Sequence, residues 1–324
     1  MGYTTGGKIL PDLIDEISAG LIASIDPVDS TSNWTNADTS WTTVVKTAIN
    51  ARRALKYTKG SETIYLALEC RNTWYTPWTT NGAKGLRVTF SSGWDSTTHT
   101  YVGSIQQTSI PYDNYVGGSP DSDLATEILT YYLWIESNGF ALMAKPEPKN
   151  TNYQQSFSLV VERNPNKLYA DGQTNFYCFN ACNIYPTLCG PSYASEPDRQ
   201  RSLMRPFVYL WPGPASGNVS TIGPNYYCTT FGSFDRSYAF KSAGNGKVYY
   251  TKPVIFNDAL EVGAVNFPPS PIFQADIWFY WSEGMGLIDG DVVAIEGQTT
   301  KYLIKALDSP DSTSRLTYAM KYVA

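Results

Sequence analysis

FQADIWFYWSEGMGLIDGDVVAIEGQTTKYLIKALDSPDSTSRLTYAMKY, residues 273–322, carries the clearest structural pattern in the chain. Apolar residues alternate with polar ones between clusters of Gly, Asp, Ser and Pro. A period of two between turn formers is the pattern of half-buried β-strands, so we predict four strands here. The sequence ends inside the last of these strands, and we therefore expect this sheet to be a framework element of the fold.

Four acidic residues cluster in this stretch, which raises the hypothesis of a glycosidase; they are Asp276, Glu283, Asp289 and Asp291. A glycosidase needs two carboxylates held across a sugar-binding cleft, and closeness in sequence does not supply that geometry. The segment Asp289-Gly290-Asp291 fits a turn, because Asp and Gly supply the side-chain hydrogen bond and the positive φ that turns use. We therefore interpret Asp289 and Asp291 as turn residues, and Asp276 and Glu283 are the acids best placed for the glycosidase alternative.

The same stretch contains four consecutive aromatic residues, Trp278 to Trp281. Alternation places Trp278 and Tyr280 on one face of a strand, with Phe279 and Trp281 on the other. A strand that is apolar on both faces is covered on both faces. We expect the protein core or a neighbouring subunit to cover these aromatic side chains. Stacking of a sugar on them is the alternative.

The N-terminal part predicts one amphipathic helix over residues 11–25. Pro11 and nearby acids suit a helix N-terminus. Apolar residues follow at spacings of three and four, which is the pattern of one buried helix face; they are Leu10, Ile14, Ile17, Leu21 and Ile25. The polar stretch that comes next carries Trp34 and Trp41, and we expect these side chains to lie on a surface outside the core.

The middle of the chain predicts antiparallel strands. One hairpin is expected from 51–58 and 62–72 across Lys59-Gly60-Ser61, and another from 128–136 and 139–145 with an Asn-Gly turn. Shorter strands are predicted at 86–90, 99–105, 156–162 and 247–256. Residues 107–127 have no periodicity and predict a long exposed loop.

The region 164–235 is rich in Pro and holds four of the chain's 5 cysteines. We interpret it as a loop-rich insertion or lateral face of one β-rich unit that spans residues 1–324. The expected fold is therefore mainly β, with antiparallel sandwich-like or barrel-like sheets, one N-terminal amphipathic helix and long loops.

Composition favours a protein that packs against copies or partners. Charged residues make up only 16% of the 324 residues, while aromatic residues make up 14% and include 24 Tyr. Tyr and Trp suit half-buried sheet faces and protein interfaces. The net charge of −5 and the absence of a basic cluster argue against nucleic-acid binding. No apolar run is long enough for a membrane span, and no signal-peptide core is found, so we expect synthesis in the cytoplasm.

Catalytic motifs are missing from the sequence. The one histidine, His99, lies in a Ser/Thr-rich turn, and no GxSxG, HExxH or P-loop sequence accompanies it. We expect His99 to be an exposed turn residue, and we expect neither an enzymatic activity nor a cofactor.

The four cysteines of the Pro-rich region leave three alternatives open; they are Cys178, Cys182, Cys189 and Cys228. Buried free thiols are favoured, because cytoplasmic synthesis disfavours disulfides. One or two disulfides remain as the second alternative. Zinc is the third, since the spacings do not match paired CxxC knuckles.

A second aromatic group lies in a Thr/Pro-rich loop and consists of Trp74, Tyr75 and Trp78. Exposed loops position binding residues, and sugar rings stack on exposed aromatic faces. Glycan binding and subunit contact are equally supported for this group.

The order of these features resembles virion structural proteins of tailed bacteriophages, in particular neck and tail proteins of contractile-tailed phages. The resemblance is carried by GGKILPDLIDEISAGLI, by the hairpin ARRALKYT…ETIYLALE, by YYLWIESNGFALMAK, and by the ending GDVVAIEGQTTKYLIKAL with RLTYAMKY. It implies a non-enzymatic part of the virion that assembles as copies in a ring, with other neck or tail proteins as partners. A tail- or baseplate-associated glycan-binding module is the alternative function.

Overall fold

The computed structural model describes residues 2–39, 51–71, 85–111, 115–116, 119–120, 128–146, 157–163, 176–182, 207–211, 226–228, 254–257, 261–262, 265–266, 270–274, 278–280, 288–307 and 316–323. The described chain is mainly β, with antiparallel sheets and one helix near the N-terminus. The prediction of fold class is therefore confirmed.

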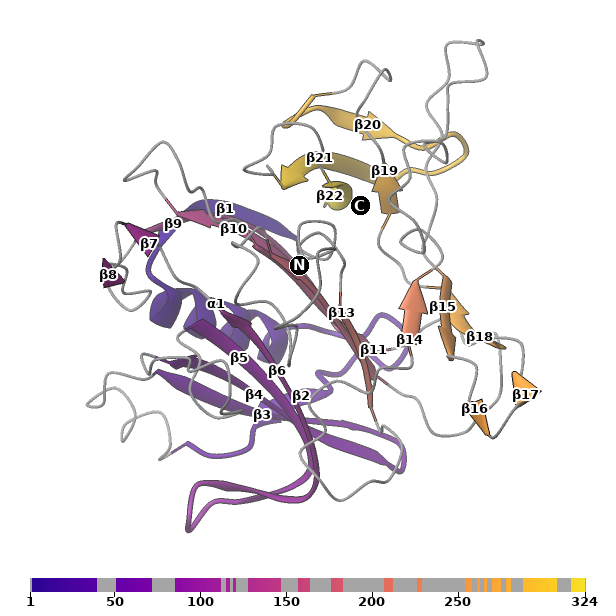
Figure 1. Cartoon of the computed structure of the whole chain (residues 1–324). Coiled ribbons are helices and arrows are strands. Elements are labelled where there is room, and N and C mark those ends of the chain that lie inside the picture. Colours follow the sequence, from indigo (N-terminus) through magenta and orange to yellow (C-terminus); the bar gives the residue numbers. More distant parts are fainter. Residues whose placement is uncertain are drawn as a thin grey trace.

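Two large sheets form the body of the molecule (Figure 1). Sheet I has six strands in the order β1 (Tyr3–Lys8), β9 (Leu129–Glu136), β10 (Gly139–Pro146), β11 (Phe157–Arg163), β12 (Phe176–Cys182) and β13 (Phe207–Trp211). Sheet II has five strands in the order β2 (Trp34–Asn36), β3 (Arg52–Lys59), β4 (Glu62–Arg71), β5 (Gly85–Asp95) and β6 (Thr100–Pro111).

A third sheet and three smaller ones complete the described structure. Sheet III has four strands in the order β19 (Trp278–Tyr280), β22 (Leu316–Val323), β21 (Lys301–Leu307) and β20 (Val292–Ala294). The smaller sheets consist of β14 (Tyr226–Cys228), β15 (Val254–Asn257) and β18 (Ser270–Gln274), of β16 (Glu261–Val262) with β17 (Val265–Asn266), and of β7 (Tyr115–Val116) with β8 (Ser119–Pro120).

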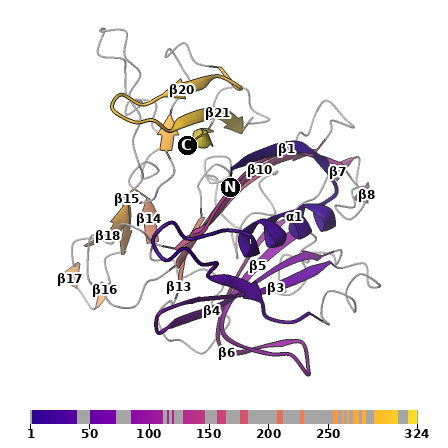
Figure 2. The same cartoon turned by 180° about the vertical axis from the view of Figure 1, so that it is seen from behind.

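The core lies between sheets I and II, with helix α1 (Leu10–Ile22) packed at one side (Figures 1 and 2). Alternate residues of each strand point into this core because successive strand side chains face opposite sides of a sheet. From β4 the core takes Ile64, Leu66, Leu68 and Cys70, as the alternation predicted. Sheet I contributes in the same way; its residues include Leu129, Tyr131, Leu133, Phe140, Leu142, Leu159 and Val161.

Helix α1 confirms the predicted amphipathic helix but ends earlier. Its apolar face is buried in the core, and the residues on it include Leu10, Ile14, Ile17 and Leu21. The predicted end at residue 25 is wrong, because the helix stops at Ile22 and Ile25 is 56% exposed. The Ser24 hydroxyl donates a hydrogen bond of 2.5 Å to the Leu21 carbonyl and so satisfies one acceptor at the helix end.

Both predicted hairpins are confirmed. β3 pairs with β4 around Gly60, which has a φ of +60°, and β9 pairs with β10 around Ser137-Asn138. Gly139 begins β10 with a φ of +152°, and a Cβ there would lie 1.9 Å from the Val161 carbonyl oxygen on β11. Glycine is therefore required at this position by the closeness of the next strand.

Two expectations for the first half need correction. β6 continues to Pro111, so the predicted loop over 107–127 begins inside a strand, because pairing with β5 supplies order that local periodicity did not reveal. Trp34 is 1% exposed and lies in the core. From the Pro-rich region 164–235, β12 and β13 continue sheet I. Trp41 lies outside the described residues.

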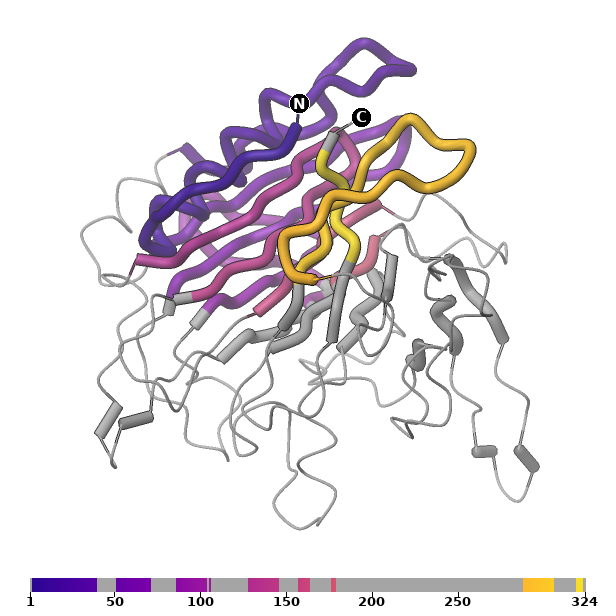
Figure 3. Tube along the Cα trace, turned by 90° about the horizontal axis from the view of Figure 1, so that it is seen from above, coloured from indigo at the N-terminus to yellow at the C-terminus, as the bar shows by residue number. Residues whose placement is uncertain are grey.

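The C-terminal stretch forms the four predicted strands as sheet III. The turn at Asp289–Asp291 is confirmed: Gly290 has a φ of +96°, and the Ile288 backbone N–H donates to the Asp291 carboxylate at 2.8 Å. The expected role of the C-terminal stretch as the framework is wrong, because no residue of sheet III belongs to the main core cluster of the described chain. Sheet III lies instead on the outer face of sheet I (Figures 1 and 3).

Candidate interaction surface

Strand β1 forms an exposed edge of sheet I (Figures 2 and 3). One side of β1 pairs with β9, from Tyr3 opposite Trp134 to Lys8 opposite Leu129. On the other side no strand pairs with β1 among the described residues, and its four central residues, Thr4 to Gly7, are exposed. An edge of this kind presents unpaired backbone groups that can take up a further strand.

The register of the ladder shows which backbone groups face outward. The Ile135 N–H donates to the Gly2 carbonyl at 3.3 Å, so this pair is a hydrogen-bonded one. Such pairs recur at every second residue of an antiparallel ladder. The backbone N–H and C=O groups of Tyr3, Thr5 and Gly7 therefore point to the open side of β1.

The centre of β1 lacks the usual protection of an edge strand. Natural sheets cover or blunt their edges with charged residues, Pro or bulges. The central sequence Thr-Thr-Gly-Gly has none of these, and its pairing with β9 shows no irregularity of register. The edge is thus flat and open to a partner.

A groove of about 610 Å³ runs beside this edge. Its walls are β1 and the solvent-facing side of α1; the lining includes Thr4, Lys8, Asp12, Asp15, Glu16, Ala19, Gly20 and Ala23. Small side chains line one end and carboxylates the other. The following helix thus provides a second surface for whatever pairs with β1.

Glu16 ties α1 to β1 at the floor of the groove. Its carboxylate accepts hydrogen bonds from the Thr4 hydroxyl at 2.9 Å and the Tyr131 hydroxyl at 2.7 Å, and it pairs with the Lys8 ammonium at 2.8 Å. Burial raises the pKa of Glu16, but the bonds from Lys8, Tyr131 and Thr4 outweigh burial and hold that pKa below its usual value. The bond to Glu16 likewise raises the pKa of Lys8. This network fixes the helix against the edge strand.

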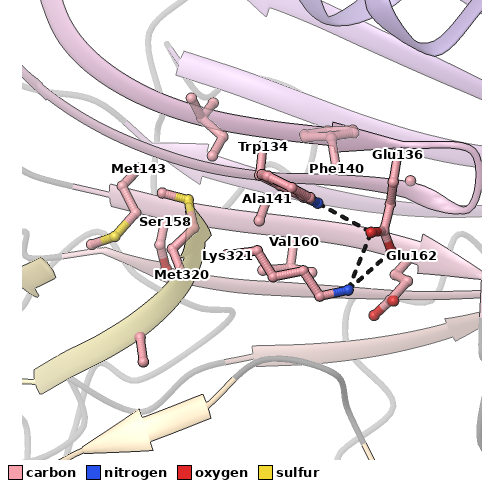
Figure 4. A pocket seen from close by; sticks show the side chains of 13 residues that line it. Trp134, Glu136, Phe140, Ala141, Met143, Ser158, Val160, Glu162, Met320 and Lys321 are labelled. Atoms are coloured by element: carbon pink, nitrogen blue, oxygen red, sulfur yellow. Dashed lines mark hydrogen bonds and ion pairs between the residues drawn. The ribbon is translucent and has the colours of Figure 1, made fainter. Parts of the chain in front are cut away.

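Sheet III meets the outer face of sheet I at a crevice of about 50 Å³ (Figure 4). Met143 of β10 and Met320 of β22 line it, and Lys321 pairs with the Glu136 carboxylate at 3.1 Å. Glu136 also accepts a hydrogen bond from the Trp134 indole at 3.1 Å. We interpret the crevice as the seam between two layers, since it is small and its polar side chains bind one another.

The outer face of sheet II carries a buried polar cluster. His99 lies 2.6 Å from the Asp38 carboxylate, which also accepts a hydrogen bond from the Trp94 indole at 3.1 Å. Asp38 is 2% exposed and His99 is 25% exposed as side chains. His99 lies in a turn as predicted, but the expectation that it is exposed is wrong, because its ring is partly buried against Asp38.

A second polar group lies beside this cluster: the Tyr101 hydroxyl donates to Glu69 at 2.6 Å, and Arg52 pairs with Glu69 at 2.7 Å. Burial, followed by the Glu69 charge, raises the pKa of Tyr101. Buried charges need partners of this kind, and the group satisfies that need. We therefore interpret this group as structural, because its side chains bind one another.

The residues proposed from the sequence have varied outcomes. Trp74, Tyr75 and Trp78 lie outside the described residues, as does Cys189. Trp278 and Tyr280 belong to β19, Cys182 to β12 and Cys228 to β14, but only their backbone is described. Cys178 is a buried free thiol, and burial raises its pKa.

The β1 edge was missed by sequence reasoning. Thr-Thr-Gly-Gly has no alternation of apolar and polar residues and contains no strongly strand-forming run. Pairing with the hydrophobic strand β9 makes it a strand. The available sequence signal, a short polar segment directly before a predicted helix, predicts an edge strand with low specificity.

Comparison with known protein families, with characterised proteins and with solved structures finds no match to this chain. Among the described residues, no helix has both the length and the apolar character needed to cross a membrane. In the same part of the chain, no group of three or more His, Cys, Asp or Glu side chains is placed to hold a metal ion.

Proposed function

We propose that this chain is a non-enzymatic structural component of a tailed-phage virion, which assembles as copies in a neck, collar or tail ring. The structural observation behind the proposal is the open edge of β1 with its adjoining groove, which offers a binding place for another protein of the assembly. A flat unprotected edge is a liability for a free monomer, because it templates pairing with another chain. Such an edge suits a protein that works with partners bound.

Composition and the sequence resemblance support the same proposal. Few charges and many Tyr and Trp residues suit surfaces that become contacts between chains. Subunits in a ring repeat one head-to-tail interface that closes by rotation. The resemblance to neck and tail proteins adds the place of assembly, the virion, with other neck or tail proteins as partners.

Mass photometry and negative-stain imaging of the purified chain test this proposal. We expect closed rings of a uniform number of copies, formed alone or on addition of a neck or tail protein encoded beside it. A chain that stays monomeric in both conditions and binds glycans on an array would contradict the proposal. That result would favour the alternative of a glycan-binding module acting through Trp74, Tyr75 and Trp78.

A further inference from the structure

We propose that the β1 edge binds an extended, basic segment of another protein chain, which adds a strand to sheet I above the solvent-facing side of α1. This inference rests on the proposed assembly function and names the chemistry of one partner. It is carried by the backbone of β1 and by the charges of the groove.

Backbone pairing supplies the first part of recognition. The outward groups of Tyr3, Thr5 and Gly7 offer donors and acceptors to an added strand, as in β-strand addition. No described residue hydrogen-bonds to these outward groups, and the central residues are exposed. Strand addition recognises any extended segment, so selectivity comes from the side chains that face the groove.

The charges of the groove favour a basic partner. Three carboxylates line it, from Asp12, Asp15 and Glu16. Lys8 pairs with Glu16 and Arg53 pairs with Asp15, while Asp12 is exposed and forms no ion pair among the described residues. An incoming Lys or Arg therefore meets a net negative charge at this end of the groove, where the charge of Asp12 also raises the pKa of Lys8 without forming an ion pair with it.

The opposite end of the groove favours apolar side chains. Ala19 and Ala23 line it, and Gly20 lies so close to Ile135 that a Cβ on it would be 2.3 Å from the Ile135 Cδ1. Because alternate residues of an added strand face the same side, its groove-facing residues change along the strand from basic to apolar.

A second copy of this chain fits the edge less well. If two copies paired through β1, each would bring its own α1 to the same side of the extended sheet. Both helices carry the same acidic residues towards the groove. Like charges brought together oppose this pairing of β1 with β1, so at this edge the observations favour a basic segment of a different chain.

The test uses the full chain and two synthetic peptides. The basic probe is a short acetylated peptide of alternating Thr and Val, with Lys at successive groove-facing positions near the Asp12 end. The acidic probe has Glu in place of Lys. We expect saturation with the basic probe to slow hydrogen exchange of the outward amides of Tyr3, Thr5 and Gly7 by about tenfold, as measured by NMR. The acidic probe is expected to bind at least about fivefold more weakly.

Two variants localise the binding. Thr5→Pro removes an outward N–H and leaves the ladder to β9 in place, since Pro is tolerated on the open side of an edge strand; it is expected to abolish binding. Asp12→Lys is expected to weaken the basic probe about fivefold, and because Asp12 lies in the first turn of α1, a small fall in melting temperature is expected as well. Glu296→Lys, in the turn between β20 and β21, makes the same charge change away from the groove and is expected to leave binding unchanged.

Three results would overturn the inference: unchanged exchange of the β1 amides at high concentrations of the basic probe, equal binding of both probes, or dimers of the chain in which these amides are already protected. The experiments give different results for failure of this inference and for failure of the proposed assembly function. Rings in which the β1 amides exchange freely keep the assembly proposal and overturn this one. A chain that binds the basic probe at β1 but never assembles would keep this inference and overturn the assembly proposal.

Discussion

Replacement of Trp34 by Ala is expected to destabilise the protein by about 3–5 kcal/mol, the usual cost of removing a large aromatic side chain from a core. The Trp34 ring is 1% exposed and makes edge-on contacts with Tyr57 at 5.0 Å and Phe176 at 5.9 Å between ring centroids. Its indole N–H donates to the Ser137 carbonyl at 2.9 Å. One side chain thus joins β2 of sheet II to the β9–β10 turn of sheet I.

The variant Trp34→Phe removes the indole N–H and part of the packing of the ring. It keeps an aromatic ring but leaves the buried Ser137 carbonyl without its donor, which costs about 1–3 kcal/mol. Tyr57→Phe is the matched control in the same cluster. The Tyr57 hydroxyl is buried with no hydrogen-bond partner among the described residues, and burial raises its pKa to about 12. Its removal is expected to be neutral or stabilising.

Urea denaturation followed by circular dichroism measures these free energies of unfolding. The expected order of stability is Tyr57→Phe at or above the unmodified chain, then Trp34→Phe, then Trp34→Ala. A loss below about 1 kcal/mol for Trp34→Ala would refute the placement of this ring between the two sheets. Equal effects of the two Phe variants would refute the hydrogen bond to Ser137.

Further predictions concern the helix anchor, one turn and one thiol. Because the pKa of Glu16 is lowered in the fold, its contribution to stability is present above the unfolded pKa and is lost as pH falls through the folded value. Glu16→Gln should therefore flatten the fall in thermal stability between about pH 6 and about pH 3 relative to the unmodified chain, and an unchanged slope would contradict the network. Gly139→Ala should cost more than about 2 kcal/mol in the same urea assay, because its Cβ would overlap the Val161 carbonyl; a neutral effect would contradict this register. Cys178, buried and with a raised pKa, should react with a thiol reagent only after unfolding, and rapid labelling of the native chain at this position would show that the site is open.

Local pattern alone determined much of the strand inventory. The alternation in β4 identified its core face, and turn chemistry located the hairpin around Gly60 and the turn at Asp289–Asp291. These features depend on neighbours in sequence, so they can be read without the tertiary structure. The spacing of Leu10 to Leu21 predicted helix α1 for the same reason, while its end depended on a bond from Ser24.

Only the tertiary structure decided which sheet is central and where the open surface lies. Trp34 stands in a polar stretch, and its burial depends on Tyr57 and Phe176, which are distant in sequence. The Thr-Thr-Gly-Gly segment of β1 became a strand edge through pairing with β9, more than a hundred residues away. Long-range pairing and packing assign such segments their roles, because their own side chains carry no periodic signal.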